Sequence, residues 1–237
     1  MTRGQTRVRP GSDTGLTPDG GDGGAGPRIA LIDYGAGNLA SVRKALAAVG
    51  AHVFTPSSPA ELAPAAGVIV PGVGNFDATR AIDNEWRTAI LRGVDRGVPL
   101  FGICLGMQYL FEGSDEAPGV PGLGLLRGHC ELLPSTVKVP HVGWNALTIT
   151  RPSTLLDSAE PVVASAFRRE DEPQVYFTHS YAAPVTADCV ATSEHGARFA
   201  AAVERGHVFG VQFHPEKSSD AGLRILRAFV TRCSRND

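Results

Sequence analysis

The chain has 237 residues, of which 43% are hydrophobic, so it can bury the core of one large α/β domain or of two small ones. Its 22 Lys and Arg residues against 24 Asp and Glu residues give a formal net charge of −2, which argues against a nucleic-acid-binding protein. No apolar run approaches the roughly 20 residues that span a bilayer, so we expect no membrane partner. The 4 cysteines form no CxxC pair and follow no signal peptide, which predicts a cytoplasmic protein without disulfides or a zinc site.

The amino-terminal part of the sequence begins without a pattern and then alternates apolar runs with helical spacings. Residues 1–27 are rich in Gly, Thr and Arg, so we interpret them as a disordered extension or a misassigned start, and residues 28–237 as the domain. The apolar run at 28–33 predicts a strand buried on both faces. A helix over 39–49 and a strand at 52–55 complete a βαβ unit.

The same alternation continues through the middle of the chain. A strand at 68–70, a helix around 81–97 and a strand at 99–103 predict a parallel sheet with helices on both faces. Further strands separated by turns, which add an antiparallel portion, are expected within residues 136–150, 175–185, 189–193 and 199–213. A helix over 219–232 closes the chain behind Ser and Asp capping candidates. The predicted fold class is therefore α/β, a single domain with a mixed, largely parallel central sheet flanked by helices.

A cysteine between two glycines gives the sharpest chemical signal. In Gly102-Ile-Cys104-Leu-Gly106 it follows an apolar strand and opens a helical stretch. In such an elbow the nucleophile projects from the turn, and the backbone N–H of the next residue, Leu105, points at a developing oxyanion. The positive end of a helix also favours a thiolate. The alternative is a buried, inert cysteine, because free Cys is among the most buried residue types.

A histidine and a carboxylate lie two positions apart at the end of another apolar strand, in Gly210-Val-Gln-Phe-His214-Pro-Glu216. Residues i and i+2 of an extended segment face the same side. Glu216 can therefore accept a hydrogen bond from one imidazole nitrogen of His214 while the other nitrogen faces a thiol. A strand-end histidine beside a solvated glutamate is the alternative. The coincidence with the Cys104 elbow favours a Cys-His-Glu catalytic triad.

A glycine-rich loop, Pro71-Gly72-Val73-Gly74, follows the third predicted strand. Ligand sites of such sheets lie at the carboxyl ends of the strands, so this loop can lie beside the cysteine elbow. Glycines leave backbone amides free to point at an oxyanion, so Gly72, Val73 and Gly74 are candidates for the second oxyanion donor. A plain turn explains the same residues.

Taken together, Gly102-Ile-Cys104-Leu-Gly106-Met-Gln108 and His214-Pro-Glu216 closely resemble the triad-type, class I glutamine amidotransferases, which have a flavodoxin-like architecture. Within that superfamily, the sequence resembles the glutaminase subunit of imidazole glycerol phosphate synthase over residues 28 to about 230. The segments that carry this second resemblance are Asp33-Tyr-Gly-Ala-Gly-Asn38, Pro71-Gly-Val-Gly-Asn-Phe76, Val139-Pro-His141-Val-Gly-Trp144-Asn145, Tyr176-Phe-Thr-His179-Ser-Tyr181 and His214-Pro-Glu-Lys217-Ser.

The resemblance implies that glutamine binds beside Cys104, with Gln108 on the substrate and with His179 and Ser180 near the pocket. It implies that the triad hydrolyses glutamine through a γ-glutamyl thioester, without a metal or an organic cofactor. Ammonia then passes to a (βα)8-barrel cyclase subunit, which forms imidazole glycerol phosphate and aminoimidazole carboxamide ribonucleotide in histidine biosynthesis. The residues expected to face this partner in a heterodimer are Asn38, His141, Trp144, Asn145 and Lys217.

Three other functions compete with this interpretation. A glutaminase of another synthase, such as the pyridoxal phosphate or anthranilate systems, is disfavoured by the Pro-His-x-Gly-Trp-Asn segment. A silent scaffold subunit is disfavoured because all three triad residues are present, and a free-standing cysteine hydrolase or peptidase because no dedicated substrate-binding addition is visible. Trp144 and Tyr181 could equally be core aromatics. The remaining cysteines are interpreted as structural, and they are Cys130, Cys189 and Cys233.

Overall fold

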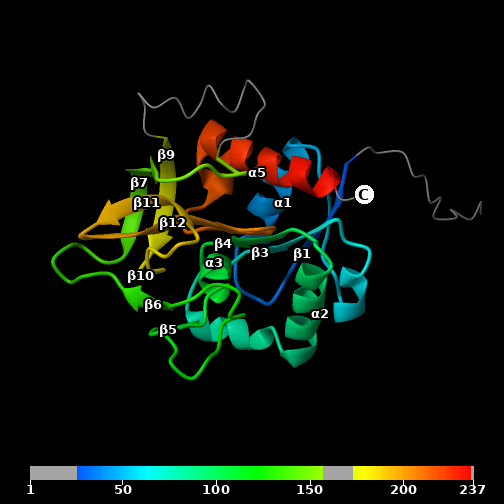
Figure 1. Ribbon diagram of the computed structural model, residues 1–237, viewed down its shortest axis with the longest axis horizontal. Coiled ribbons are helices and arrows are strands. Elements are labelled where there is room, and N and C mark those ends of the chain that lie inside the picture. Colours follow the sequence, from blue (N-terminus) through cyan, green and yellow to red (C-terminus); the bar gives the residue numbers. More distant parts are fainter. Residues whose placement is uncertain (1–25, 157–172, 236–237) are drawn as a thin grey trace, which may run out of the picture.

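The computed structural model describes residues 26–156 and 173–235, so nearly all of the predicted amino-terminal extension lies outside the described part. A central sheet has helices on both of its faces (Figure 1). Its eight strands lie in the order β2-β1-β3-β4-β13-β12-β11-β8, and a three-stranded sheet, β10-β6-β5, and a two-stranded sheet, β7-β9, accompany it. The strands are β1 (Arg28–Leu31), β2 (His52–Phe54), β3 (Gly67–Val70), β4 (Leu100–Ile103), β5 (Gly113–Ser114), β6 (His129–Leu132), β7 (His141–Ala146), β8 (Thr148–Ile149), β9 (Gln174–His179), β10 (Tyr181–Ala182), β11 (Cys189–His195), β12 (Ala197–Arg205) and β13 (Val208–Val211).

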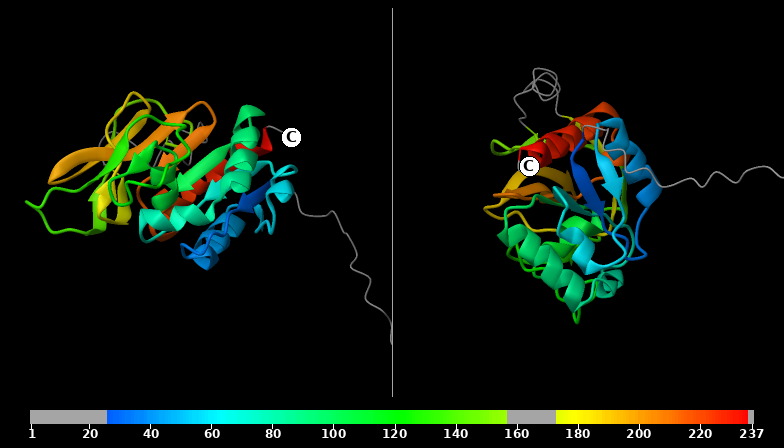
Figure 2. Two further views of the ribbon diagram at one scale, coloured as in Figure 1. Left: turned by 90° about the horizontal axis from the view of Figure 1, so that it is seen from below. Right: turned by 90° about the vertical axis from the view of Figure 1, so that its right-hand side faces the viewer.

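The central sheet is parallel through its first five strands and antiparallel beyond them. Strands β2, β1, β3, β4 and β13 pair in parallel, whereas β12, β11 and β8 pair in antiparallel fashion. The antiparallel strands gather at one end of the molecule, away from β1 and β2 (Figure 2). The predicted mixed, largely parallel sheet is therefore confirmed.

Helices cover the two faces of the sheet, with α1 and α5 on one side and α2 and α3 on the other (Figure 1). The α-helices are α1 (Leu39–Ala48), α2 (Asn84–Asp95), α3 (Leu105–Tyr109) and α5 (Ser219–Ser234), and the 3-10 helices are η1 (Pro59–Leu62), η2 (Phe76–Ala81) and η3 (Pro215–Lys217). Within the described residues, no helix combines the length and the apolar character that crossing a membrane requires.

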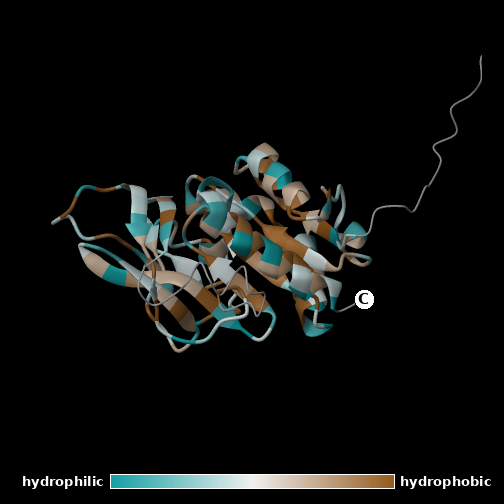
Figure 3. Ribbon diagram, turned by 90° about the horizontal axis from the view of Figure 1, so that it is seen from above, coloured by the Kyte–Doolittle hydropathy of each residue, from teal (hydrophilic) through white to brown (hydrophobic). Residues whose placement is uncertain are grey.

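Two hydrophobic cores lie on opposite faces of the sheet because successive strand side chains point in opposite directions. In β1, Ile29 and Leu31 join the core beneath α1 and α5, whereas Ala30 joins the core that includes α3. The same alternation in β3, β4 and β13 buries each of these strands on both faces. The strands at the centre are accordingly hydrophobic, while hydrophilic residues lie on the outer sides of the helices (Figure 3).

The helix predicted around residues 81–97 begins later than the sequence pattern indicated. The carboxylate of Asp83 accepts hydrogen bonds from the backbone N–H groups of Glu85 and Trp86, at 2.9 and 3.1 Å, and so fixes the first turn of α2. Residues Phe76–Ala81 form a separate 3-10 helix instead. The difference follows from the cap, because Asp83 satisfies amides that would otherwise lack partners.

All four cysteines lie in the described part of the chain, where each is buried and none forms a disulfide. Cys130, Cys189 and Cys233 are distributed through the hydrophobic cores, in agreement with a structural role. Cys233 is fully buried, and its sulfur packs directly against Gly67 of β3.

Candidate active site

The predicted cysteine elbow lies between β4 and α3. Cys104 is buried and has φ 53° and ψ −107°, a backbone conformation that costs free energy for any residue except glycine. Its N–H donates to the carbonyl of Val211 in β13 at 2.8 Å, which holds the strained turn against the neighbouring strand. Leu105 begins α3, so its N–H belongs to the first helical turn, where backbone amides have no intrahelical acceptor.

Both glycines of the elbow are required by close packing. A Cβ atom on Gly106 would collide with the carbonyl oxygen of Val70 in β3, and one on Gly102 would lie 2.5 Å from the carbonyl oxygen of Gly106. Neither residue can carry a side chain unless β3 or α3 moves. The glycines therefore allow the turn to fit tightly beneath Cys104.

His214 and Glu216 form a buried pair at the end of the segment that follows β13. The His214 Nδ1 atom lies 2.8 Å from Glu216 Oε1, and their side chains are 2% and 3% exposed. The backbone N–H of His214 donates to the backbone carbonyl of Tyr176 at 2.9 Å, and the backbone carbonyl of His214 accepts a hydrogen bond from the Ser218 hydroxyl at 2.6 Å. These backbone contacts fix where the imidazole lies, and Glu216 fixes its orientation.

The surroundings of His214 favour its protonated form. Burial by itself lowers the pKa of His214, but interactions with Cys104 and Glu216 and the negative charges of both groups outweigh burial and raise that pKa to about 9. Because Nδ1 is bonded to Glu216, Nε2 is the nitrogen left for Cys104, and Nε2 is buried without another hydrogen-bond partner among the described residues. A thiol, an imidazole and a carboxylate thus lie in one cluster.

The glycine-rich loop lies beside the elbow because β3 and β4 are parallel neighbours and both end at the same edge of the sheet. A Cβ atom on Gly72 would lie 2.8 Å from Leu105 Cβ and would collide with the hydroxyl of Tyr34. Gly74 has φ +109° and reaches the wall of the cavity that contains Cys104. Val73 is exposed. The loop therefore lies beside the elbow and the cavity, and the role of its three amides as oxyanion donors stays a prediction.

A cavity of about 240 Å³ opens beside Cys104. This volume is small compared with that of sites for drug-sized ligands. Predicted site residues make up much of its wall, namely Gly74, Cys104, Leu105, Gln108, His179 and Ser180. His214 lies behind Cys104 and is buried. The structure thus brings the predicted nucleophile and the predicted substrate contacts to one cavity.

Glu116 lines the same cavity and was not singled out by the sequence analysis. Its carboxylate accepts a hydrogen bond from the backbone N–H of Phe76 at 2.7 Å, and burial raises the pKa of this carboxyl against the opposing effect of that bond. A lone glutamate in a loop after β5 carries no recognisable pattern. Only the fold shows that it lies across from the cysteine elbow.

A chain of hydrogen bonds links Asn145, His141, His179 and Tyr181. His179 Nδ1 lies 3.0 Å from the Tyr181 carbonyl oxygen, His141 Nδ1 lies 3.0 Å from His179 Nε2, and Asn145 Nδ2 lies 3.2 Å from His141 Nε2. A carbonyl can only accept, so His179 carries its proton on Nδ1 and accepts at Nε2. His141 then donates from Nδ1 and accepts from Asn145, which fixes one neutral tautomer for each ring.

The residues expected to face the partner differ in exposure. Trp144 is 52% exposed, Asn38 and Lys217 are exposed, and Asn145 is partly exposed. The His141 side chain is 4% exposed and stacks on Phe177 and His195, so it lies beneath the surface. His141 is hydrogen-bonded to the partly exposed Asn145, and its expected place at the partner interface stays a prediction.

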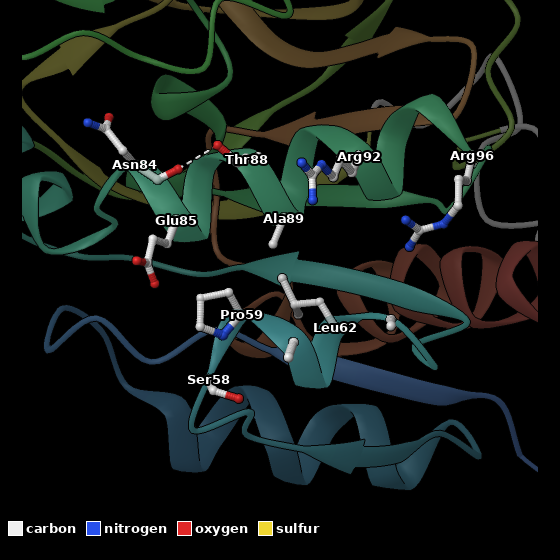
Figure 4. Close-up of a pocket in the computed structure, with 11 residues that line it drawn as sticks. Ser58, Pro59, Leu62, Asn84, Glu85, Thr88, Ala89, Arg92 and Arg96 are labelled. Atoms are coloured by element: carbon white, nitrogen blue, oxygen red, sulfur yellow. Dashed lines mark hydrogen bonds between the residues drawn. The ribbon is translucent and has the colours of Figure 1, made fainter.

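A second hollow of about 720 Å³ lies between η1 and α2, where Figure 4 shows Pro59 and Leu62 facing Ala89 and the arginines Arg92 and Arg96 nearby. None of the predicted site residues lines it. This hollow is larger than the cavity beside Cys104, but it is not the candidate active site, because Cys104 and His214 lie elsewhere.

Comparison with known proteins agrees with this geometry. Residues 30–233 match the family model described as glutamine amidotransferase class-I. The chain belongs to this family. It is 46% identical to the imidazole glycerol phosphate synthase subunit HisH of Moorella thermoacetica, over 85% of this chain and 93% of the relative. It is 42% identical to the subunit of the same name from Methanothermobacter thermautotrophicus, over 85% of this chain and 97% of the relative.

Solved structures resemble this amidotransferase in fold. One described as the structure of PurLQS from Thermotoga maritima has a TM-score of 0.67 at 21% identity and covers 87% of this chain and 98% of its own. Another, described as the crystal structure of glutamine amidotransferase, has a TM-score of 0.66 at 18% identity with the same coverage. At these identities the likeness supports the architecture.

Acidification is expected to destabilise this amidotransferase through its histidine chain. Burial lowers the pKa of His141 to about 4 and that of His179 to about 3, the latter against the opposing hydrogen bond to Tyr181. A histidine in the unfolded chain has a pKa of about 6.5. Between about pH 6.5 and 4 the folded state therefore binds fewer protons than the unfolded state, and it loses stability as the pH falls. His214 has the opposite shift and stays protonated in both states below about 6.5, so it does not contribute in this window.

The measurement is the free energy of unfolding by urea at near-neutral and at mildly acidic pH. The parent should lose on the order of 2 kcal/mol more than His141→Gln over this range, because the variant removes one buried titrating ring. His52→Gln, at an exposed position in β2, serves as the matched control and should follow the parent. Equal losses in the parent and in His141→Gln would show that the buried ring does not control acid stability.

Proposed function

We propose that this chain hydrolyses glutamine to glutamate and ammonia and supplies the ammonia to a (βα)8-barrel cyclase subunit. That partner forms imidazole glycerol phosphate and aminoimidazole carboxamide ribonucleotide in histidine biosynthesis. The observation that carries the proposal is the strained Cys104 elbow beside the His214–Glu216 pair, at the wall of a small cavity. The names of the HisH relatives support the partner and the product.

In the first half of the proposed cycle Cys104 forms a covalent bond to the substrate. His214 Nε2 takes the thiol proton, and the thiolate attacks the side-chain amide carbon of glutamine. The carbonyl oxygen becomes an oxyanion, which the Leu105 N–H and an amide of the Gly72–Gly74 loop stabilise. Protonated His214 donates its proton to the amide nitrogen, and collapse of this intermediate breaks the carbon–nitrogen bond and releases ammonia.

The second half returns the enzyme to its starting state. His214 takes a proton from water, which attacks the γ-glutamyl thioester through a second oxyanion. Collapse breaks the carbon–sulfur bond and releases glutamate, and the proton on His214 returns to the Cys104 thiolate. Glu216 accepts a hydrogen bond from His214 Nδ1 throughout the cycle. It therefore holds the neutral imidazole of His214 in one tautomer and stabilises the imidazolium when His214 is protonated. The cycle uses side chains, backbone amides and water, and no cofactor takes part.

Substrate recognition follows from the groups at the cavity wall. Glutamine carries an α-ammonium group, and Glu116 places a carboxylate in the cavity that can pair with it. Gln108 supplies a neutral amide from α3, the helix that begins directly after Cys104. His179 is held neutral by burial and Ser180 follows it at the wall, so this side of the cavity adds polar contacts without a positive charge.

We propose that the cyclase docks on the exposed face of β7 and β9. Trp144 packs edge-to-face on Tyr176 with ring centroids 6.2 Å apart, and the Lys217 ammonium lies 5.8 Å from the Tyr176 ring. Val142, also on β7, is exposed beside them. A large aromatic at the surface is typical of an interaction site. A cytoplasmic location is part of the proposal, and the free thiols fit a reducing compartment.

One titration tests both the activity and the partner. Glutamate release from glutamine is measured at increasing cyclase concentration, with the cyclase nucleotide present throughout. We expect release to saturate with the parent chain, and Trp144→Ala to raise the half-saturating cyclase concentration by about 30-fold, which corresponds to about 2 kcal/mol at an aromatic anchor. The melting temperature of the isolated variant should not change, because half of the Trp144 side chain is already in solvent.

Leu132→Ala is the matched control, since Leu132 is 57% exposed on β6, outside the proposed docking face. It should leave the half-saturating concentration unchanged. A lower melting temperature for Trp144→Ala with unaltered association would identify Trp144 as a structural residue. Absence of cyclase-dependent glutamate release from the parent would contradict the proposed function itself.

A further inference from the structure

Gln212 is a fully buried polar residue for which the proposed cycle has no role. It lies between the end of β13 and His214, and its backbone N–H donates to the carbonyl of Ala201 at 2.9 Å. Gln212 and His214 are two positions apart, and both side chains interact with Cys104. A buried amide without hydrogen-bond partners destabilises the fold, so the contacts of Gln212 are informative.

The contacts of Gln212 join the nucleophile to the substrate-binding helix. Its Nε2 atom donates to Cys104 Sγ at 3.7 Å, and its Oε1 atom accepts from Gln108 Nε2 at 3.1 Å. Gln108 Nε2 also donates to the carbonyl of Tyr181 at 2.8 Å. The reverse orientation of the Gln212 amide would place two NH2 groups against each other and an oxygen against the sulfur. The hydrogen-bond network therefore determines which way this amide points.

The direction of the Gln212 bond suits a sulfur that carries negative charge. The Cys104 thiol can donate to the Thr178 carbonyl, 3.8 Å away, but a thiolate has no proton for that contact. The Gln212 N–H remains a favourable partner after deprotonation and strengthens, because hydrogen bonds to charged groups are stronger than neutral ones. His214 and Gln212 thus approach the same sulfur from the short segment that follows β13, the first as its base and the second as a donor that remains bonded after deprotonation.

We propose that Gln212 is a positioning residue that holds the Cys104 thiolate in the direction of attack and links it to Gln108. Both N–H groups of Gln108 are committed, to Tyr181 and to Gln212, which leaves the Gln108 carbonyl oxygen to contact glutamine. Substrate bound there restrains Gln108, which restrains Gln212 and through it the sulfur. The inference rests on the proposed function and adds a residue to it.

The test compares Gln212→Met with the parent in the complex with cyclase and nucleotide. Met fills a similar volume without a hydrogen bond. We expect kcat for glutamate release to fall about 10- to 100-fold, the loss of one hydrogen bond to a charged group, while KM stays within about 3-fold. Gln212→Glu keeps the acceptor for Gln108 but places an oxygen against the sulfur, so it should be slower than Gln212→Met.

A second readout separates positioning from packing. The rate of Cys104 alkylation by iodoacetamide is followed by peptide mass spectrometry across a pH series, and its midpoint should move upward in Gln212→Met. Ser193→Ala is the control, because the Ser193 hydroxyl is buried without a hydrogen-bond partner among the described residues and lies outside the site. It should leave both readouts unchanged.

Parental kcat and a parental alkylation midpoint in Gln212→Met would overturn the inference. If Gln212→Glu does not fold, as a melting curve would show, the Met variant alone decides. Failure of the proposed function gives a different result, because the parent complex would then release no glutamate. An active parent with an equally active Gln212→Met would remove the role of Gln212 and leave the proposed function standing.

Discussion

Cys104→Ser is expected to lower kcat/KM for glutamine hydrolysis by at least about 10³-fold while the domain stays folded. The side chains have the same shape, so serine can occupy the strained turn at φ 53° and keep the contacts of the elbow. A hydroxyl is far harder to deprotonate than a thiol, however, and the proposed cycle needs the deprotonated nucleophile beside His214 and Gln212. The measurement is glutamate release by the complex with cyclase and nucleotide.

Two controls accompany this variant. Synthesis by the cyclase from added ammonium salt should continue with Cys104→Ser, because the variant removes the source of ammonia and leaves the docking face intact. Cys189→Ser is the matched substitution of a buried cysteine outside the site, where a hydroxyl can still donate to the Ala191 carbonyl, and it should retain glutaminase activity. Hydrolysis by Cys104→Ser at a rate near that of the parent would remove Cys104 as the nucleophile.

The isolated chain is expected to hydrolyse glutamine slowly and to be accelerated about 10²- to 10³-fold by the cyclase with its nucleotide, the effect of gaining one oxyanion donor. The physical basis is the loop that contains Gly72, Val73 and Gly74 beside Leu105. A peptide next to glycine can rotate at low cost, so this loop can turn a donor toward the cavity or away from it. A partner that binds one arrangement better shifts the loop toward it.

Glutamate release is to be measured for the free chain, for the chain with cyclase, and for the complex with nucleotide. We expect the third rate to exceed the first by the factor given above, mainly in kcat, because the donor acts on the transition state. Equal rates in all three would show that the oxyanion site is already complete in the free chain.

Local patterns were sufficient to predict most of the fold and the residues Cys104, His214 and Glu216 that the structure brings into one cluster. Short apolar runs followed by helical spacings predicted the βαβ units, and β1, β3 and β4 lie where those runs are. The Cys104 elbow was recognisable because its glycines are adjacent in sequence and are needed for packing against β3. His214 and Glu216 were recognisable because they lie two positions apart in the sequence, although the structure places Glu216 in the 3-10 helix η3 and not in an extended segment.

Features that depend on contacts between distant segments could not be predicted in this way. Glu116 reaches the cavity through a loop bond to Phe76, and the inward direction of His141 depends on the stacking of His195 against it. Gln212 is an intermediate case, because it lies two positions before His214 in the sequence and its contact with Cys104 could have been considered from that spacing. Its bond to Gln108 required the fold, since the two residues are 104 positions apart.

The most direct test of the account follows the side-chain nitrogen of glutamine. Glutamine labelled with heavy nitrogen at its amide is supplied to the complex of this chain with cyclase and nucleotide, together with an excess of unlabelled ammonium. We predict that the label enters the imidazole product despite the competing ammonium, and that Cys104→Ser abolishes this transfer. Label that accumulates as free ammonium and does not enter the product, or that still reaches the product with Cys104→Ser, would contradict the account.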